Sequence, residues 1–415
     1  MTAGFRKDLQ FYKFCAYGFL KNLRFFEPFL YLFFLEKGLT YLQIGTLVTI
    51  REVLRNILEI PTGMLADVMG RRRTMIAAFS FYIVSFVVFY FTSAYLLFVV
   101  AMVFYSAGDA FRSGTHKAMI FEYLRLKGWE DQKVYYYGHT RSWSQMGSAL
   151  SSLLAAAIVF GWGDYASAFL FSTVPYMLDL LLLLSYPREL DGERRQVDRL
   201  GWGDAFMAVV REILSELRRP DQRRALSNLA LYSGTFRALK DYLQPELAAL
   251  AAVIALHSGV ADEKKVSALV IGVIFFFLYL ASSFASRYSG TFTARLGELA
   301  RALNRTLVAG LLLVMAAGLF FLLPGPWRWS VVIPFTAMYM LENLRRPVGV
   351  AYISSLFPSD ILATVLSTES QVRSLMAALI APAAGYLADH FGVGESLALT
   401  ALFLLLLQPL VRLKK

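Results

Sequence analysis

Long apolar segments recur along the whole chain, at the length that crosses a lipid bilayer. A transmembrane helix needs about twenty mainly apolar residues, and the sequence offers about twelve such segments when occasional charges are tolerated. In the first half they lie near residues 11–35, 42–66, 74–91, 96–123, 134–160 and 166–186. In the second half they lie near residues 226–250, 266–285, 303–323, 331–356, 363–387 and 397–411. The sequence therefore predicts an all-α integral membrane protein.

Composition agrees with this prediction and excludes several other classes of protein. Hydrophobic residues make up 57% of the chain, too many for an ordinary soluble domain. The net charge of +11 comes from basic residues at the ends of apolar segments, which membrane topology explains without nucleic acid. Cys15 is the only cysteine, so no intramolecular disulfide is expected. The four histidines show no metal-ligand spacing, and we expect no metal or cofactor.

Lys and Arg concentrate in alternate connections between the apolar segments. Positively charged connections stay in the cytoplasm, which predicts cytoplasmic termini. The basic connection 187–224 divides the chain into a predicted first bundle, 1–186, and a second, 225–415. Within this connection apolar residues recur at helical spacing, which predicts an amphipathic helix at the membrane surface. These residues are Phe206, Val209, Val210, Ile213, Leu214 and Leu217.

Two short matches relate the halves to each other. Residues 23–28 (LRFFEP) resemble residues 240–245 (KDYLQP), and residues 109–112 (DAFR) resemble residues 342–345 (ENLR). In both cases the matching segments fall at corresponding positions of the two halves. The matches predict two six-helix bundles related by an internal repeat.

The connection between the second and third apolar segments, residues 63–73 (GMLADVMGRRR), carries an unusual set of residues. We call it the hinge segment. Gly63 would let two helices approach closely, Gly70 permits a tight turn, and Arg71 to Arg73 cannot enter hydrocarbon. Asp67 near the arginines predicts a breakable latch. The hinge segment resembles the loop signature of the major facilitator superfamily, G-x-L-A-D-x-x-G-R-R/K, although Val68 replaces a usually basic residue.

This resemblance implies two bundles that alternate access to a site between them, with helices one, four, seven and ten lining a central cavity. Charged residues inside these helices are therefore candidates for function, because each costs about 2.5 to 3.5 kcal/mol to insert. Arg51, Arg55 and Glu59 share one face of the second helix. Two interpretations of this stripe stay open, a structural paired ladder or a functional element, and Glu52 needs a partner of its own.

The fourth helix is the most charged. Asp109, Arg112 and His116 are spaced to share one face, which is suited to proton exchange. Arg112 resembles an arginine that many superfamily members keep on this helix, often linked to proton coupling. Residues 111–118 (FRSGTHKA) resemble a segment of a multidrug-like, mostly uncharacterised branch that often has acids where His116 and Lys117 stand. Alternatively, His116 and Lys117 are already leaving the bilayer.

Cations outnumber acids among the intramembrane candidates, which favours an anionic or zwitterionic solute. The candidates for proton coupling are Asp109, Glu342, His116 and Glu27. The candidates for substrate binding are Arg24, Arg112, Arg141, Gln145, Arg237, Gln244, Arg345 and Arg373. The fifth helix lacks the antiporter signature of the family. Residues 385–392 (GYLADHFG) look like a second hinge segment, and we interpret Asp389 as a helix-end contact, with an outer latch as the alternative.

The sequence thus predicts a secondary transporter of a small anionic or zwitterionic organic solute, with alternating access and proton coupling. We expect a monomer in the plasma or inner membrane whose partners are the solute, protons and lipid. Low-selectivity efflux of drugs or metabolites is one alternative, and a lipid translocator or a non-transporting receptor is another. The sequence has no phosphate-binding loop, nucleophile elbow or H-E-x-x-H motif, so we expect neither an enzyme nor an ATP-driven pump.

Overall fold

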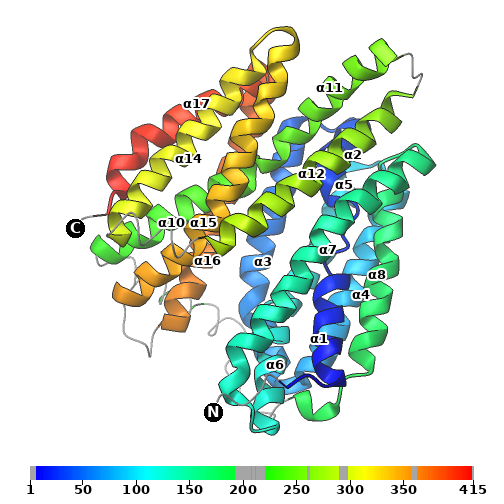
Figure 1. Cartoon of the computed structure of the whole chain (residues 1–415), viewed down its shortest axis with the longest axis vertical. Coiled ribbons are helices and arrows are strands. Elements are labelled where there is room, and N and C mark those ends of the chain that lie inside the picture. The colour runs from blue at the N-terminus through cyan, green and yellow to red at the C-terminus, as the bar shows by residue number, and fades with distance from the viewer. Residues whose placement is uncertain are drawn as a thin grey trace. The chain divides into compact units, whose positions relative to one another are not determined.

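The computed structural model describes residues 6–191, 207, 211, 220–258, 262–288, 298–356 and 362–413. Its regular structure is helical, and no strand occurs within these ranges. The amphipathic helix predicted for the central connection lies outside them, apart from residues 207 and 211. The all-α prediction is confirmed (Figure 1).

Helices occupy every predicted membrane segment. The first half contains α1 (Leu9–Leu20), η1 (Glu27–Phe29), α2 (Leu30–Glu36), α3 (Tyr41–Met69), α4 (Arg71–Phe91), α5 (Tyr95–Arg112), α6 (Thr115–Leu126), η2 (Glu130–Gln132), α7 (Lys133–Trp162), α8 (Ser167–Leu184) and η3 (Arg188–Asp191). The second half contains α10 (Pro220–Leu239), η4 (Lys240–Tyr242), α11 (Leu243–Ser258), α12 (Glu263–Arg287), α14 (Leu299–Phe321), η5 (Gly325–Val331), α15 (Val332–Leu356), α16 (Leu362–Phe391), α17 (Val393–Leu407) and η6 (Gln408–Val411).

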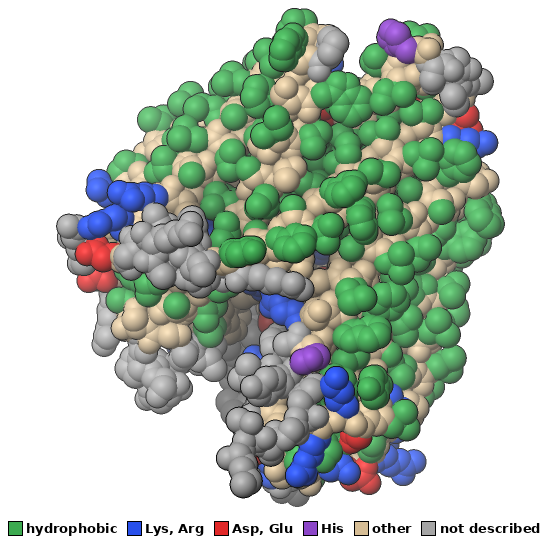
Figure 2. Space-filling view, in the orientation of Figure 1, with side chains coloured by type: hydrophobic (Ala, Val, Ile, Leu, Met, Phe, Trp, Pro, Cys, Tyr) green, Lys and Arg blue, Asp and Glu red, His purple; other side chains and the backbone are tan. Residues whose placement is uncertain are grey.

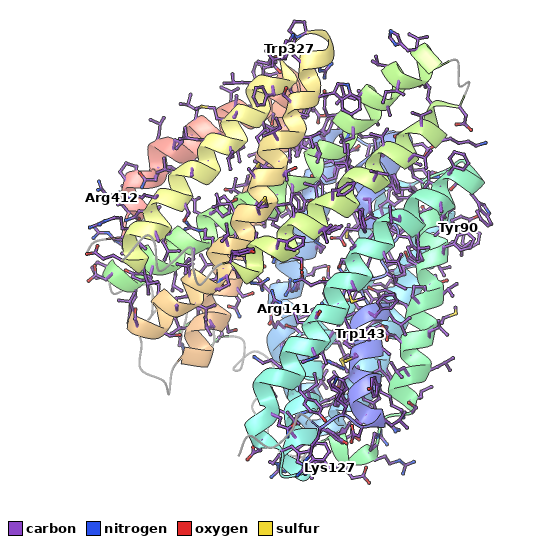
Figure 3. The ribbon with its side chains drawn as sticks, in the orientation of Figure 1. Tyr90, Lys127, Arg141, Trp143, Trp327 and Arg412 are labelled. Carbon is purple, nitrogen blue, oxygen red and sulfur yellow. The ribbon has the colours of Figure 1, made fainter. Side chains whose placement is uncertain are left out.

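The surface of these helices suits a lipid environment. In the described part of the chain, 7 helices are each long and apolar enough to cross a membrane. Figure 2 shows hydrophobic side chains over most of the visible helix faces, with Lys and Arg mainly near helix ends. Within the first half, Lys127 and Tyr90 mark opposite ends of the helices (Figure 3). The chain is therefore a multi-pass membrane protein.

Among the described residues, the first, fourth and seventh predicted membrane helices are interrupted well inside their length. The first breaks between α1 and α2, the seventh breaks at η4, and the fourth breaks between α5 and α6, where Gly114 has φ +71°. The breaks in the first and seventh helices fall on the two segments, 23–28 and 240–245, that resemble each other in sequence. Irregular backbone at membrane depth is tolerated only where it is buried in protein or lines a cavity, so the breaks locate candidate binding sites.

Contacts divide the chain into two units. Unit 1 comprises residues 1–29 and 54–208, and unit 2 comprises residues 30–53 and 209–415. The boundary inside α3 differs from the predicted bundle boundaries, because its first half packs within unit 2. There, Gly45 lies against the backbone of Ala381, and the Thr49 hydroxyl donates to the Ala378 carbonyl at 2.7 Å. The absence of a side chain at Gly45 permits this close approach of α3 and α16.

Asp389, near the end of α16, caps the first turn of α3 in unit 2. Its two carboxylate oxygens accept hydrogen bonds from the backbone N–H groups of Tyr41 and Leu42, each at 2.8 Å. These N–H groups have no partner inside their own helix, and the helix dipole favours a negative charge at this end. The predicted helix-end contact of Asp389 is confirmed.

Replacing Asp389 with alanine is expected to destabilise unit 2, because the first turn of α3 loses both acceptors. Loss of a helix cap costs about 0.5–2 kcal/mol. Thermal unfolding of the purified protein in detergent measures this effect. The Asp389→Asn variant keeps one acceptor, so its unfolding temperature should lie between those of the wild type and of Asp389→Ala. His390→Gln at the next position is the control. A wild-type unfolding temperature for Asp389→Ala would show that the cap contributes nothing.

Candidate functional site

The hinge segment forms contacts that were only partly predicted. Gly70 alone joins α3 to α4, with φ +95°, so the expected tight turn is present. The side chain of Asp67 lies outside the described part of the structure. The close helix approach expected at Gly63 is not found, because the residue is exposed and an added Cβ would meet no described atom within 4 Å.

The arginines of the hinge segment contact acids and carbonyls elsewhere in unit 1. Arg71 lies 3.8 Å from Glu122 on α6. The Arg72 guanidinium donates to the Tyr186 carbonyl at 2.9 Å, and its backbone N–H donates to Asp191 at 2.8 Å. These contacts connect the start of α4 to α6, to Tyr186 just after α8, and to η3. Glu122 and Asp191 are far from the hinge segment in sequence, so the sequence pattern did not indicate them as partners. The third arginine, Arg73, is exposed.

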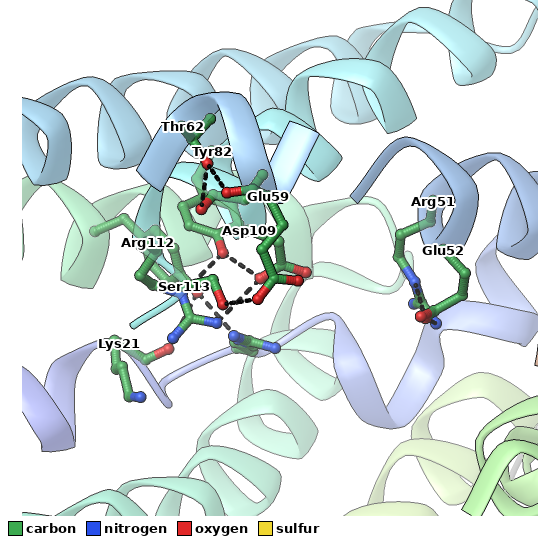
Figure 4. A network of polar contacts seen from close by, with 12 residues as sticks. Lys21, Arg51, Glu52, Glu59, Thr62, Tyr82, Asp109, Arg112 and Ser113 are labelled. Atoms are coloured by element: carbon green, nitrogen blue, oxygen red, sulfur yellow. Dashed lines mark hydrogen bonds and ion pairs between the residues drawn. The ribbon is translucent and has the colours of Figure 1, made fainter. Parts of the chain in front are cut away.

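A second group of polar side chains lies at the helix breaks of unit 1, and we call it the unit 1 cluster (Figure 4). It comprises Lys21, Arg24, Arg55, Glu59, Tyr82, Asp109, Arg112, Ser113 and Tyr176.

The first helix supplies Lys21 and Arg24 from the break that follows α1. Arg24 donates to the Tyr176 hydroxyl at 3.0 Å, and that hydroxyl donates to the Lys21 carbonyl at 3.1 Å. The backbone N–H of Phe25 donates to the Ser172 hydroxyl at 3.0 Å. Two side chains of α8 therefore satisfy polar groups that the break exposes. Tyr176 and Ser172 were not predicted, since one tyrosine or serine in an apolar helix carries no distinctive signal.

Asp109 and Arg112 lie together, as their spacing predicted. The Arg112 guanidinium is 3.1 Å from the Asp109 carboxylate and 3.0 Å from the Tyr82 hydroxyl, which itself donates to Asp109. The Asp109 charge is thus compensated by a cation and a hydroxyl. On α3, Glu59 accepts a hydrogen bond from the Ser113 hydroxyl at 2.8 Å, directly beside the break in the fourth helix.

His116 does not continue this line of groups. The helix ends at Arg112 and starts again at Thr115, so the assumed continuous face is interrupted at Gly114. His116 instead stacks on Tyr17, with ring centroids 3.6 Å apart, and its Nε2 atom lies 3.3 Å from the Tyr186 hydroxyl. The predicted shared face of Asp109, Arg112 and His116 is therefore corrected to the first two residues.

The charged stripe of α3 is divided between the two units. Arg51 belongs to unit 2 and pairs with Glu52 at 3.0 Å, whereas Arg55 and Glu59 belong to unit 1. The Nε atom of Arg55 is buried without a hydrogen-bond partner among the described residues, and its charge acts on Asp109. At one end of the stripe Arg51 pairs with Glu52, and at the other end Glu59 accepts a hydrogen bond from Ser113. Both partners, Glu52 and Ser113, lie outside the stripe.

In unit 2, Glu52 is the acid that holds Arg237. Glu52 is 2% exposed, and its carboxylate lies 2.5 Å from the Arg237 guanidinium, which also donates to Ser374 at 3.2 Å. Gln244 accepts from the Tyr31 backbone N–H at 2.8 Å and is buried. These contacts join α3 to α10, and α2 to α11.

The remaining candidates differ in their surroundings. Arg345 is 2% exposed and donates to Thr306, to the Leu303 carbonyl and to both oxygens of Asn228. This set of contacts joins α10, α14 and α15, and it does not support the predicted role in substrate binding. In unit 2, Glu342 accepts a hydrogen bond from a serine hydroxyl, and Arg373 pairs with Glu369 at 3.6 Å. In unit 1, Glu27 is the first residue of η1. On α7, Arg141 is exposed (Figure 3) and Gln145 is half-buried.

The unit 1 cluster carries an excess of positive charge at membrane depth. Among its members, four cations stand against two carboxylates, and one of these carboxylates, Asp109, already pairs with Arg112. Two further acids outside the cluster, Glu27 and Asp179, act on Arg24 and Lys21. Such a set attracts an anion, because charges interact strongly where water is scarce. No group of three or more His, Cys, Asp or Glu side chains in the described ranges is placed to hold a metal ion.

Comparison with known proteins identifies the class to which this architecture belongs. The family model for the Major Facilitator Superfamily matches residues 14–341. The chain is 23% identical over 424 aligned positions to an uncharacterised MFS-type transporter, YxaM, of Bacillus subtilis (strain 168), covering 95% of this chain and 93% of that protein.

Solved structures show the same fold. The nucleoside transporter NupG superposes with a TM-score of 0.73 at 10% identity, covering 97% of this chain and 96% of the other. The peptide transporter POT in complex with sulfate superposes with a TM-score of 0.70 at 14% identity, covering 99% of this chain and 96% of the other. The chain therefore belongs to the major facilitator superfamily of secondary transporters.

Proposed function

We propose that the protein moves a small anionic or zwitterionic organic solute across the cell membrane by alternating access, coupled to protons. The observation that supports this proposal most strongly is the excess of cations in the unit 1 cluster, at the breaks in the first and fourth helices. Broken helices present backbone groups and side chains at membrane depth, which is where transporters of this architecture bind their solutes.

In the proposed mechanism, Arg24 and Arg112 bind the negatively charged group of the solute. A guanidinium presents five N–H donors in a planar fork that matches a carboxylate or phosphate. The contacts to Tyr176, Tyr82 and Asp109 orient the two guanidinium groups and occupy only part of each fork. Within unit 1, Arg141 and Gln145 are further ligands in this proposal.

Asp109 is the first candidate for proton exchange among the predicted residues, ahead of Glu342, Glu27 and His116. Its charge is balanced by Arg112, so it stays ionised while the pair is intact. A solute that draws Arg112 away removes that compensation, and protonation of Asp109 then becomes favourable. Binding of solute and binding of a proton would be linked in this way.

We also propose that the hinge segment acts as a cytoplasmic latch, with both termini on the same side. Its arginines hold α4 against Glu122 on α6 and against the end of α8. In this proposal the latch holds the outward-open state by pinning the inner ends of the helices of the first bundle, and it can open because ion pairs at the membrane surface are individually weak. We place the protein, as a monomer, in the plasma or inner membrane.

Low-selectivity efflux is a second candidate function, favoured by the aromatic rings beside the unit 1 cluster. Phe26 stacks on Phe169 with ring centroids 4.7 Å apart, and Tyr82, Tyr105 and Tyr176 pack around Phe86. Aromatic surfaces accept many flat apolar solutes. The excess of cations nevertheless favours the anionic or zwitterionic solute.

A thermal-shift screen of the purified protein tests the proposed function. Metabolite anions, zwitterions, neutral solutes and cations are added across a range of pH, and bound solutes raise the unfolding temperature by mass action. We expect stabilisation by a restricted group of anions or zwitterions, and no such effect in an Arg112→Gln variant that is confirmed to be folded. A preference for cations would contradict the charge argument, and stabilisation by many unrelated apolar solutes would favour efflux.

A further inference from the structure

An acid that the sequence interpretation did not consider, Asp179, lies deep in unit 1. It is fully buried on α8, and neither carboxylate oxygen has a hydrogen-bond partner among the described residues. It stands three residues after Tyr176 and seven after Ser172, which places all three on one face of the helix. Those two residues support the break in the first helix. Asp179 therefore continues the polar face of α8 that borders the unit 1 cluster.

The charged group that acts on Asp179 is Lys21, from the break after α1. The Lys21 ammonium also lies 5.6 Å from the centre of the Tyr17 ring. Tyr17 on α1 and Tyr186 beyond the end of α8 are the other titratable groups in the field of Asp179. From α4, Tyr82 packs against Tyr176 of the same α8 face, and from α5 and α6, Arg112 and His116 interact with Lys21.

Burial without partners is costly for a carboxylate and much less costly for a neutral carboxylic acid. An isolated ionised group in a medium of low dielectric loses most of its solvation, and in practice it takes up a proton instead. Asp109 differs in this respect, because Arg112 and Tyr82 already compensate its charge. In this conformation the surroundings of Asp179 therefore favour its protonated form, whereas those of Asp109 favour the carboxylate.

We propose that Asp179 carries the coupling proton and that Lys21 supplies the counter-charge once the proton has left. When the break in the first helix moves and admits water, the O–H bond of the carboxylic acid breaks and the proton passes to water. The remaining carboxylate is balanced by the Lys21 ammonium, with no redox change. Because Tyr176 links Arg24 to the Lys21 backbone, a solute that displaces Arg24 would also disturb Lys21, whose charge acts on Asp179. This inference rests on the proposed proton coupling and assigns it to a different residue from Asp109.

Infrared spectroscopy tests the assignment with protons as the only ligand. The full-length protein is reconstituted in liposomes of phosphatidylethanolamine and phosphatidylglycerol and titrated from acid to alkaline pH. The chain contains 30 Asp and Glu residues, so the signal of Asp179 is taken from the difference between the spectra of the wild type and of Asp179→Asn at each pH. We expect this difference to contain the carbonyl band of a carboxylic acid that stays protonated after the exposed carboxylates have ionised, and that disappears as the pH rises further. The band should remain in Asp109→Asn, which is the matched control.

Two further variants separate a proton site from a purely structural role. Asp179→Glu should restore a titrating band, and Lys21→Met should keep the band to higher pH because the carboxylate has lost its counter-charge. A band that is unchanged in Asp179→Asn, or that disappears in Asp109→Asn instead, would overturn the inference. Thermal unfolding confirms that each variant is folded before the spectra are compared.

The failure of this inference can be distinguished from the failure of the proposed function. If the wild-type protein moves its solute without any response to a pH gradient, proton coupling is wrong, and the role of Asp179 is rejected together with it. If pH-driven transport is present in the wild type and persists at full rate in Asp179→Asn, only the assignment to Asp179 is rejected.

Discussion

Replacing Arg112 with glutamine is expected to abolish solute transport and to lower the unfolding temperature. The substitution leaves Asp109, which is 9% exposed, with the Tyr82 hydroxyl as its remaining hydrogen-bond partner among the described residues. Removing one partner of a buried ion pair costs on the order of 3 kcal/mol, because the other charge is left uncompensated. Thermal unfolding in detergent and solute flux into liposomes measure the two effects.

A double variant separates stability from function at this pair. Arg112→Gln combined with Asp109→Asn removes both charges and should recover most of the lost stability, because no buried charge is left unpaired. Transport should still be absent, since the solute has lost its guanidinium ligand. If the double variant transports at the wild-type rate, the pair is only structural. Arg301→Gln is the matched control, because Arg301 pairs with Glu298 at the same helical spacing but is exposed.

Replacing Arg345 with lysine is expected to have the second large effect, this time on folding. The guanidinium bridges α10, α14 and α15 through Asn228, Leu303 and Thr306, and an ammonium group cannot reach all of these acceptors in the same geometry. Buried acceptors left without donors cost about 1–3 kcal/mol each. The yield of folded protein from detergent extracts and the unfolding temperature should both fall.

The neighbouring residue provides the control for this experiment. Arg346 is exposed on the same helix, so Arg346→Lys should leave the unfolding temperature unchanged. A contrary result is equally clear. If Arg345→Lys unfolds at the wild-type temperature but no longer binds solute, Arg345 is a substrate ligand, as the sequence predicted, and its contacts contribute little to folding.

The sequence predicted the fold well because membrane helices depend on local composition. Each apolar segment coincides with one helix or with two consecutive helices, and the hinge segment lies at the expected connection. The sequence match between residues 23–28 and 240–245 also corresponds to a structural feature, because the regular α-helix is interrupted at both places. The prediction that Asp109 and Arg112 lie together is confirmed, because residues three apart in one helix lie on the same face.

The errors arose where the outcome depends on tertiary contacts or on one backbone angle. His116 left the predicted face because Gly114 adopts a positive φ and ends the helix, which helical spacing alone does not reveal. The partners of the hinge arginines, Glu122 and Asp191, come from distant parts of the chain. Asp179 was overlooked because a single acid in a leucine-rich helix gives no pattern, and only its burial makes it notable.

The most direct test of the central claim measures flux of a solute from the thermal-shift screen into sealed liposomes that contain the purified protein. We expect accumulation that is driven by an imposed pH gradient, that is accompanied by proton movement reported by a trapped pH dye, and that is absent in the folded Arg112→Gln/Asp109→Asn variant. Binding of the solute without any flux, or flux at full rate in that variant, would contradict the proposal that the unit 1 cluster is the site of a proton-coupled transporter.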